Sequence, residues 1–340
     1  MFLSYFKIIF MPAKILVTGG AGFIGSALIH ALNQQGERKI LVTDVHLDPL
    51  REAHLSFLKY TNYLSAEELL LALQKNDQLL KEITTVFHLG ACSSTLEMNR
   101  DFLMKNNFQY TKTLAAWSLS RGIRFVYASS AATYGDGSAG MKDDLEGLEK
   151  LRPLNLYGES KHLFDLYARD HGWFDHLVGL KYFNVFGPNE DHKKEMRSLV
   201  CKAYEQIRDT GRMTLFKSYR SDYAHGEQQR DFIYVQDAVR MTLHLAETKY
   251  AHGLFNIGSS VARSWLDLAN ALFAALHRQP VIDFIEMPEK MRAQYQYHTC
   301  ADITRLRATG YRTPTTSLEE AIEDYVCNYL IPGKHLGELA

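Results

Sequence analysis

A tyrosine and a lysine four residues apart, Tyr157 and Lys161, are well suited to acid–base chemistry. On a helix this spacing places the two side chains next to each other. A phenol with a pKa of about 10 is a poor base at neutral pH, but a neighbouring ammonium favours the phenolate. We predict that Lys161 lowers the pKa of Tyr157, which then exchanges a proton with a substrate hydroxyl. Ser130 is expected to supply a hydrogen bond to the same oxygen. Such pairs also occur on solvated helix faces, where they have no catalytic role. The surrounding sequence must therefore show whether this pair is catalytic or only solvated.

A glycine-rich stretch near the start of the chain provides that context. Gly19, Gly22 and Gly25 follow an apolar run and precede an amphipathic one, which predicts a strand, a tight turn and a helix over residues 15–32. Such glycines let the backbone approach a pyrophosphate at the helix N-terminus, and an acid after the second strand, here Asp44, can bind a ribose. The stretch therefore predicts a dinucleotide site, with a purely structural glycine turn as the alternative. Lys161 is then expected to hold a cofactor ribose.

Two more predicted strands end in small polar residues. Residues 86–90 lead into the loop 91–95, and residues 125–128 lead into the segment 129–135, where Ser130 lies. Ligands bind at such strand ends in open α/β sheets. We expect a doubly wound parallel sheet, a mostly helical segment between residues 44 and 81, and a helix over residues 265–276 that Ser264 caps, with Asp267 three residues later.

Composition limits the other classes of function. The chain has 340 residues and a formal net charge of -1, so it lacks the basic footprint of a nucleic-acid-binding protein, and no apolar run of about 18 residues predicts a membrane span. The four cysteines have no CxxC spacing, which predicts neither a metal site nor a disulfide framework and fits a cytoplasmic protein. We expect residues 1–11 to be an extension, with Met11 as the true start.

The glycine stretch, the Ser129–Ser130 strand end and the Tyr157/Lys161 pair together resemble the extended short-chain dehydrogenase/reductase superfamily. The resemblance implies a Rossmann domain, a nicotinamide cofactor, and catalysis by Ser130, Tyr157 and Lys161. We expect residues 12–182, 231–260 and about 297–311 to form the cofactor domain. A smaller interleaved α/β substrate lobe is expected from residues 183–230, 261–296 and 312–330.

Longer stretches resemble one family in particular, the ADP-glyceromanno-heptose 6-epimerases. These stretches are 88–95, 127–135, 156–161, 182–193, 287–296 and 301–302. The resemblance implies interconversion of ADP-D-glycero- and ADP-L-glycero-β-D-manno-heptose for the lipopolysaccharide inner core. The C6 carbinol would be oxidised by bound NADP+ and the ketone reduced from its other face. It also implies a cytoplasmic homo-oligomer, commonly a pentamer.

Carried onto this chain, the resemblance assigns residues to three roles. Acid–base chemistry on the second face would fall to Lys193, whose alternative is a solvated loop lysine beside Lys194; His192 is expected to be structural or at the surface. The cofactor residues would be Gly19, Gly22, Phe23, Ile24, Gly25, Asp44, Val45, Arg51, Lys59, Leu89, Gly90, Ala91, Cys92, Ser93, Asn106, Lys161, Val185 and Lys193. The substrate residues would be Asn184, Glu195, Lys202, Phe216, Lys217, Ser218, Tyr219, Arg230 and Tyr295, the last of which could instead be a core aromatic.

Some residues depart from the family pattern. Asp44 favours a free ribose 2'-hydroxyl and hence NAD, whereas the family prefers NADP, for which Arg51 or Lys59 would have to neutralise a 2'-phosphate. Glu195 and Lys202 stand where the family has Ser and His. Two alternatives therefore stay open: an epimerase or dehydratase for another nucleotide sugar such as a UDP-hexose, and a non-catalytic NAD(P)-binding protein.

Overall fold

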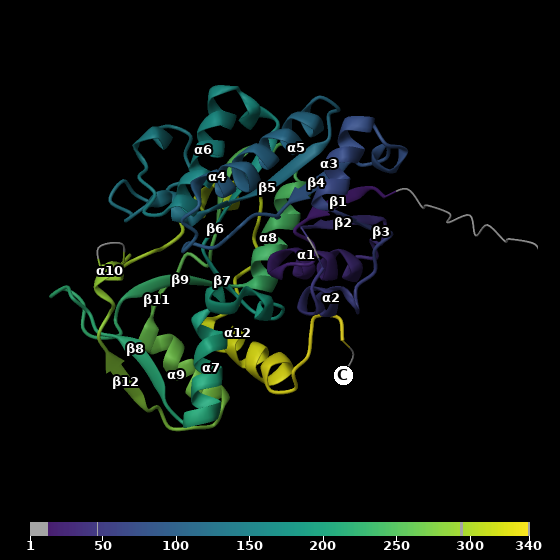
Figure 1. Ribbon diagram of the computed structural model, residues 1–340. Coiled ribbons are helices and arrows are strands. Elements are labelled where there is room, and N and C mark those ends of the chain that lie inside the picture. The colour runs from purple at the N-terminus through teal and green to yellow at the C-terminus, as the bar shows by residue number, and fades with distance from the viewer. Residues whose placement is uncertain (1–12, 46, 293–294, 339–340) are drawn as a thin grey trace, which may run out of the picture.

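The computed structural model describes residues 13–45, 47–292 and 295–338. Its largest element is a parallel seven-stranded sheet in the order β10-β6-β5-β4-β1-β2-β3, shown in Figure 1. The strands are β1 (Ile15–Thr18), β2 (Ile40–Asp44), β3 (Asn62–Ser65), β4 (Thr85–His88), β5 (Arg124–Ser130), β6 (Leu177–Tyr182) and β10 (Gly253–Ile257). The strand order reverses between β1 and β4, which is where doubly wound sheets bind ligands. The prediction of a doubly wound parallel sheet is confirmed.

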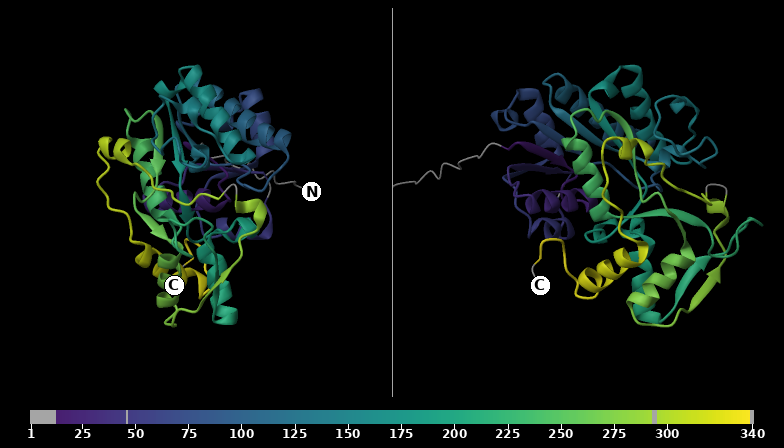
Figure 2. Two further views of the ribbon diagram at one scale, coloured as in Figure 1. Left: turned by 90° about the vertical axis from the view of Figure 1, so that its left-hand side faces the viewer. Right: turned by 180° about the vertical axis from the view of Figure 1, so that it is seen from behind.

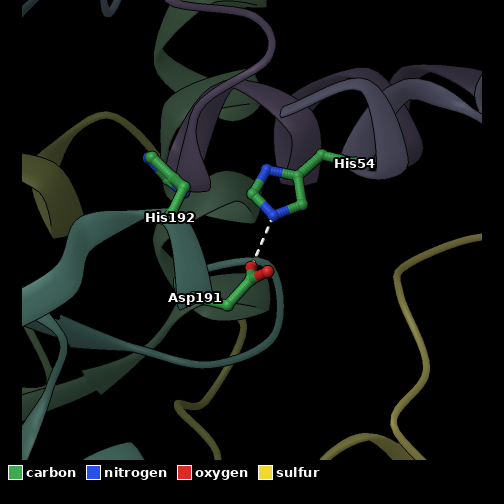
Figure 3. Close-up of side chains that lie close together, drawn as sticks. All are labelled: His54, Asp191 and His192. Carbon is green, nitrogen blue, oxygen red and sulfur yellow. Dashed lines mark hydrogen bonds and ion pairs between the residues drawn. The ribbon is translucent and has the colours of Figure 1, made fainter. Parts of the chain in front are cut away.

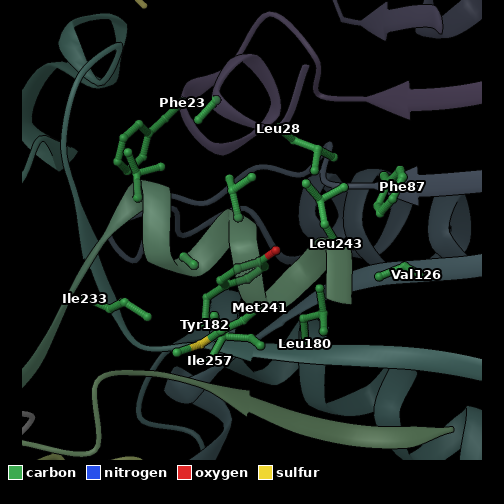
Figure 4. Close-up of a cluster of buried hydrophobic side chains, with 14 of the residues drawn as sticks. Phe23, Leu28, Phe87, Val126, Leu180, Tyr182, Ile233, Met241, Leu243 and Ile257 are labelled. Atoms are coloured by element: carbon green, nitrogen blue, oxygen red, sulfur yellow. The ribbon is translucent and has the colours of Figure 1, made fainter. Parts of the chain in front are cut away.

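Helices cover both faces of this sheet (Figures 1 and 2). One face carries α1 (Phe23–Gln34), α2 (Pro49–Leu55) and α8 (Val235–Glu247), and the other carries α3 (Ala66–Lys75), α4 (Arg100–Leu103), α5 (Tyr110–Leu119) and α6 (Leu156–Asp170). The apolar side chains of α1 and α8 pack together on the sheet, with Leu28, Leu243, Phe87 and Leu180 in the core (Figure 4). This packing fixes the start of α1 against the ends of β1 and β4.

The second part of the chain forms smaller elements below the main sheet in Figure 1. Its strands are β7 (Asn184–Phe186), β9 (Gln229–Tyr234) and β11 (Ala262–Ser264) in one sheet, and β8 (Met213–Phe216) and β12 (Ile282–Ile285) in another. Its helices are α7 (Leu199–Thr210), α9 (Trp265–Ala275), α10 (Glu289–Arg292) and α12 (Leu318–Tyr325), whereas α11 (Thr304–Ala308) packs against β10 of the main sheet. The chain passes repeatedly between these elements and the main sheet. The exact division into two lobes stays a proposal, and the expected extension 1–11 lies outside the described residues.

Local signals explain some of these elements and not others. The predicted start of α9 is present, because Ser264 and Asp267 form a reciprocal capping box. The prediction of a mostly helical segment between residues 44 and 81 is wrong in part, because Asn62–Ser65 forms β3. This strand is half-buried at the edge of the sheet and has no apolar run to announce it. Within the described residues, no helix is both long and apolar enough to cross a membrane.

Candidate functional site

The glycine-rich turn between β1 and α1 is built around close backbone contacts. Gly19 has φ +67°, and a Cβ there would lie 2.6 Å from the backbone of Gly90, in the loop after β4. A Cβ at Gly25 would lie 2.0 Å from the carbonyl oxygen of Gly19. α1 begins after Gly22, and no side chain caps its N-terminus. Its first backbone N–H groups are therefore available to an anion, as a dinucleotide pyrophosphate would require.

A cavity of about 290 Å³ lies at this turn and gathers most of the predicted cofactor and catalytic residues. Its predicted members are Gly19, Gly22, Phe23, Ile24, Gly25, Asp44, Arg51, Leu89, Gly90, Ala91, Ser93, Ser130, Tyr157, Lys161, Val185 and Lys193. A neighbouring hollow of about 500 Å³ adds Val45, Cys92 and Asn106 and shares Asp44 and Arg51. Residues far apart in the sequence thus surround one continuous region at the strand ends.

The structure does not bring Lys59 to this region. Lys59 is exposed and lines a separate surface hollow with Arg38 and Glu52. Its backbone N–H donates to the side chain of Asn33, which holds it away from Asp44. Lys59 thus lies apart from the predicted cofactor residues, whereas Arg51 lies beside Asp44.

Tyr157 and Ser130 meet at the start of α6. Asn155 caps this helix by accepting from the backbone N–H of Gly158 at 2.8 Å, which places Tyr157 in the first turn. Tyr157 is hydrogen-bonded to Ser130, and Lys161 donates to the carbonyl oxygen of Ala128 at 2.8 Å. The phenol, the hydroxyl and the ammonium therefore stand at the end of β5, facing the cavity.

The expectation that Lys161 lowers the pKa of Tyr157 is not met. Burial raises the pKa of Tyr157, and the hydrogen bond from Ser130 only partly opposes this. The negative charge of Asp165 adds to the upward shift. Without further positive charge the phenol keeps its proton, so Tyr157 is prepared as a proton donor.

Burial also lowers the pKa of Lys161, to about 8, although the carboxylate of Asp165 opposes the shift. Between pH 8 and about 10.4 the unfolded chain binds more protons at this residue than the folded chain does, so its contribution to stability rises with pH. Lys161→Met removes the buried charge and is expected to raise the free energy of unfolding at pH 7 by about 2 kcal/mol, after allowing for the lost hydrogen bond. This advantage over the wild type should disappear near pH 10.

Urea unfolding of the wild type and of Lys161→Met at pH 7 and pH 9.5 measures the difference in their free energies of unfolding. Lys150→Met, at an exposed lysine outside the cavity, controls for the loss of a surface charge and should change stability little at either pH. A difference between Lys161→Met and the wild type that stays constant with pH would contradict the expectation.

Asn107 fixes the loop after β4 and was given no role by the sequence. It accepts from the N–H of Cys92 and donates to the carbonyl oxygen of Cys92, both at 2.9 Å. Asn107 lies in a π-helical segment, η2 (Met104–Gln109), between α4 and α5. Such segments are frequent at functional sites. Its neighbour Asn106, a predicted cofactor residue, faces the hollow beside Asp44.

Lys193 reaches the cavity from the other side of the main sheet. It lies in η6 (Asp191–Met196), which packs on α2, whereas Tyr157 comes from α6 on the opposite face. The ammonium of Lys193 lies 5.0 Å from the centre of the Phe23 ring, and burial lowers its pKa. The ring of His192 also lines the cavity, and burial lowers its pKa to about 4, so it is neutral at physiological pH.

A second cavity, of about 530 Å³, opens from Lys193 towards the smaller elements. It is lined by Asn184, Lys202, Phe216 and Tyr295 among the predicted substrate residues. Arg230 is buried behind it, 5.0 Å from the ring centre of Tyr295 and 5.5 Å from that of Trp265. Tyr295 accepts a hydrogen bond from Trp265 at 2.8 Å, so it has both a packing contact and a face on the cavity.

Besides Arg230, four other predicted substrate residues do not line this cavity. Glu195 is exposed, and its backbone carbonyl oxygen accepts a hydrogen bond from Lys202 at 3.2 Å. Lys217 pairs with Glu286 at 2.7 Å, and Tyr219 hydrogen-bonds the same carboxylate. The backbone N–H of Ser218 donates to His225. Lys217 and Tyr219 thus contact the residue after β12, and Ser218 contacts the segment after β8; none of the three lines the second cavity.

Comparison with known proteins places the chain in a family. Residues 15–258 match the model of the NAD dependent epimerase/dehydratase family. The chain is 46% identical, over 93% of its length and 97% of the other protein, to ADP-L-glycero-D-manno-heptose-6-epimerase of Nitratidesulfovibrio vulgaris. The crystal structure of the Helicobacter pylori enzyme of that name is similar with a TM-score of 0.77 at 29% identity, covering 93% of this chain and 96% of that one.

A more distant solved structure shows the ligands of a related enzyme. UDP-glucuronic acid 4-epimerase from Bacillus cereus, in complex with UDP-glucuronic acid and NAD, is similar with a TM-score of 0.74 at 27% identity, covering 93% of this chain and 99% of that one. A nicotinamide cofactor thus fits the family as well as the glycine turn. The chain belongs to the NAD dependent epimerase/dehydratase family and, within it, to the ADP-L-glycero-D-manno-heptose-6-epimerases.

Proposed function

We propose that this protein interconverts ADP-D-glycero-β-D-manno-heptose and ADP-L-glycero-β-D-manno-heptose, a step in the supply of heptose for the lipopolysaccharide inner core. The observation that carries the proposal is that Tyr157 and Lys193 line one cavity but come from opposite faces of the sheet. An epimerisation that passes through a ketone needs an acid–base group on each side of the carbonyl. A simple dehydrogenase needs only one.

The residues divide the work between the two faces of C6. A bound nicotinamide supplies reversible hydride transfer, so the reaction has no net oxidation. Tyr157, hydrogen-bonded to Ser130, holds or accepts the proton of the C6 hydroxyl in one epimer. Lys193 holds or accepts the proton of the oppositely placed hydroxyl in the other epimer. Arg230 packs on the ring of Tyr295, which lines the second cavity, and would bind the diphosphate through its planar fork.

The experiment is incubation of the purified protein with ADP-D-glycero-β-D-manno-heptose while NMR follows the configuration at C6. The expected result is a mixture of both epimers with no accumulation of reduced nicotinamide. UDP-glucose and UDP-glucuronic acid serve as comparison substrates. Turnover of a UDP sugar without turnover of the heptose would transfer the proposal to another nucleotide sugar, and no turnover of any substrate would favour a binding protein.

We further propose NADP as the preferred cofactor, with Arg51 binding the 2'-phosphate. Arg51 lies beside Asp44 and pairs with Asp48 at 2.5 Å, while its Nε is buried and has no hydrogen-bond partner. Arg51→Ala is expected to weaken NADP binding by about 10- to 100-fold, the equivalent of a charge-assisted hydrogen bond, and to leave NAD binding nearly unchanged. Fluorescence titration with both cofactors measures the ratio.

Lys59→Ala is the matched control for this change. It removes a positive charge that is close in the sequence but lies in a separate hollow, so the affinities for NADP and for NAD should both be retained. An equal loss of NADP and NAD affinity in Arg51→Ala would contradict the assignment to the 2'-phosphate.

From the family resemblance we also propose that the protein is cytoplasmic and forms a homo-oligomer, a pentamer. Light scattering on the purified protein would test the number of subunits.

A further inference from the structure

His54 connects two segments whose relative position matters for the proposed reaction. It lies at the end of α2, and its ring is completely buried. Nδ1 lies 2.9 Å from the carbonyl oxygen of Ala21 in the glycine-rich turn, and Nε2 lies 2.6 Å from a carboxylate oxygen of Asp191 (Figure 3). Asp191 is two residues before Lys193. One side chain therefore joins the turn at the start of α1 to the loop that carries the second acid–base group.

Both contacts of His54 are made by groups that can only accept. A backbone carbonyl oxygen has no hydrogen to give. Burial would raise the pKa of Asp191, but the hydrogen bond from His54 and the charges around it lower the pKa overall, so Asp191 is a carboxylate. Each ring nitrogen of His54 thus lies within hydrogen-bond distance of an oxygen atom, one on each of the two segments.

The two contacts of His54 argue against a metal ion here. The ligand atoms of His54, Asp191 and His192 lie within 4.8 Å of one another, close enough to share a cation. His54 could join such a site only by giving up its hydrogen bond to Asp191. The cluster is better explained as a link between segments, and the rings of His192 and His335 pack against His54 at centroid distances of 5.0 and 5.4 Å.

The loop joined to His54 needs to be held. Lys194, next to Lys193, has φ +52° and ψ -121°, a conformation that a side-chain-bearing residue rarely adopts. Such a backbone persists only when surrounding contacts impose it. Glu190 fixes one end by accepting from Ser198 N at 2.5 Å and from Ser198 Oγ at 2.6 Å. His54 holds the stretch between, directly beside Lys193.

We propose that His54 is a positioning residue that sets Lys193 relative to the cofactor turn, which rests on the epimerase function proposed above. Loss of the Asp191 contact lets the strained loop relax away from the turn and carries the Lys193 ammonium off its place above Phe23. Displacement of a catalytic group by about 1 Å lowers turnover by about 100-fold. The turn itself keeps its own close packing against Gly90, so cofactor binding survives.

Two substitutions separate the two contacts. His54→Asn places an amide near the position of Nδ1, so it keeps a donor for Ala21 and loses the contact to Asp191. His54→Gln reaches the position of Nε2 and keeps a donor for Asp191. We expect turnover to fall about 100-fold in His54→Asn, with cofactor affinity retained, and to be largely rescued in His54→Gln. Adding His54→Asn to Lys193→Met should cause no further loss of turnover, because both changes act through the Lys193 ammonium.

Limited trypsin digestion of the cofactor-bound protein tests the loop without any substrate. Cleavage after Lys193 and Lys194 should become several-fold faster in His54→Asn and stay close to wild type in His54→Gln, while cleavage after the exposed Arg220, in another loop, serves as the internal reference. Equal cleavage after Lys194 in wild type and His54→Asn would overturn the proposal. So would a further loss of turnover in the double variant. If the wild type shows no heptose turnover but the cleavage difference is found, the epimerase proposal fails and the role of His54 in the loop stands.

Discussion

Tyr157→Phe is expected to lower epimerisation by about 1000-fold, within the range of general acid–base catalysis. The change removes one oxygen atom and leaves the ring in the first turn of α6. Because the phenol is hydrogen-bonded to Ser130 and faces the cavity, its loss removes the group that exchanges a proton with the C6 oxygen of one epimer. The Michaelis constant should change little, since the nucleotide part of the substrate contacts other residues.

Steady-state turnover of both epimers measures this effect. Tyr167→Phe is the matched control, because Tyr167 lies on the same helix, where it packs against Trp173 and His171. It should keep wild-type turnover. If Tyr157→Phe kept more than about a tenth of the activity, the effect would be too small for a general acid–base residue, and the proton transfer would have to be assigned to another residue.

Asp165→Ala is expected to lower the free energy of unfolding by about 4 kcal/mol, because it leaves a buried cation without a partner. Asp165 accepts hydrogen bonds from Tyr127 at 2.6 Å and Ser129 at 2.7 Å, and forms an ion pair with Lys181 at 2.9 Å. The side chains of Asp165 and Lys181 are both fully buried. Asp165 also follows Lys161 by one helical turn, so the change loosens the joint between α6 and the end of β5 that carries Ser130.

Urea unfolding followed by circular dichroism measures the loss. Asp170→Ala, at an exposed acid on the same helix, is the control and should change stability by less than about 0.5 kcal/mol. The double variant Asp165→Leu with Lys181→Met should recover much of the stability, because an apolar pair of similar size can replace a buried ion pair. Equal effects of Asp165→Ala and Asp170→Ala would show that the buried pair contributes little.

Short sequence patterns predicted the parts of the site that are local. The glycine turn was predictable because its three glycines and the flanking apolar runs are adjacent in the sequence. The pairing of Tyr157 and Lys161 followed from helical spacing, which the structure has in α6. In such cases the residues that determine the geometry lie within one or two turns of chain.

What the sequence could not predict depends on contacts between distant residues. His54 and Asp191 are 137 positions apart, and nothing in the spacing of either marks their contact. Arg51 and Lys59 were equivalent as cations in the sequence, but only the path of the chain after α2 puts one beside Asp44 and the other in a separate hollow. The direction of the pKa shift of Tyr157 likewise depends on burial by the whole fold.

The position of β10 beside β6 has a consequence for the synthesis of the protein. β6 is completely buried in the finished sheet, and its outer edge is covered by β10, whose first residue follows Tyr182 by 71 positions (253 minus 182). A ribosome adding 5–20 residues per second needs roughly 4 to 14 s to make that interval. During this time a nascent chain presents an apolar strand with unpaired backbone groups, the kind of edge that recruits other strands. Cells that make this protein quickly are therefore expected to depend on chaperones that shield the growing chain until residue 257 has emerged.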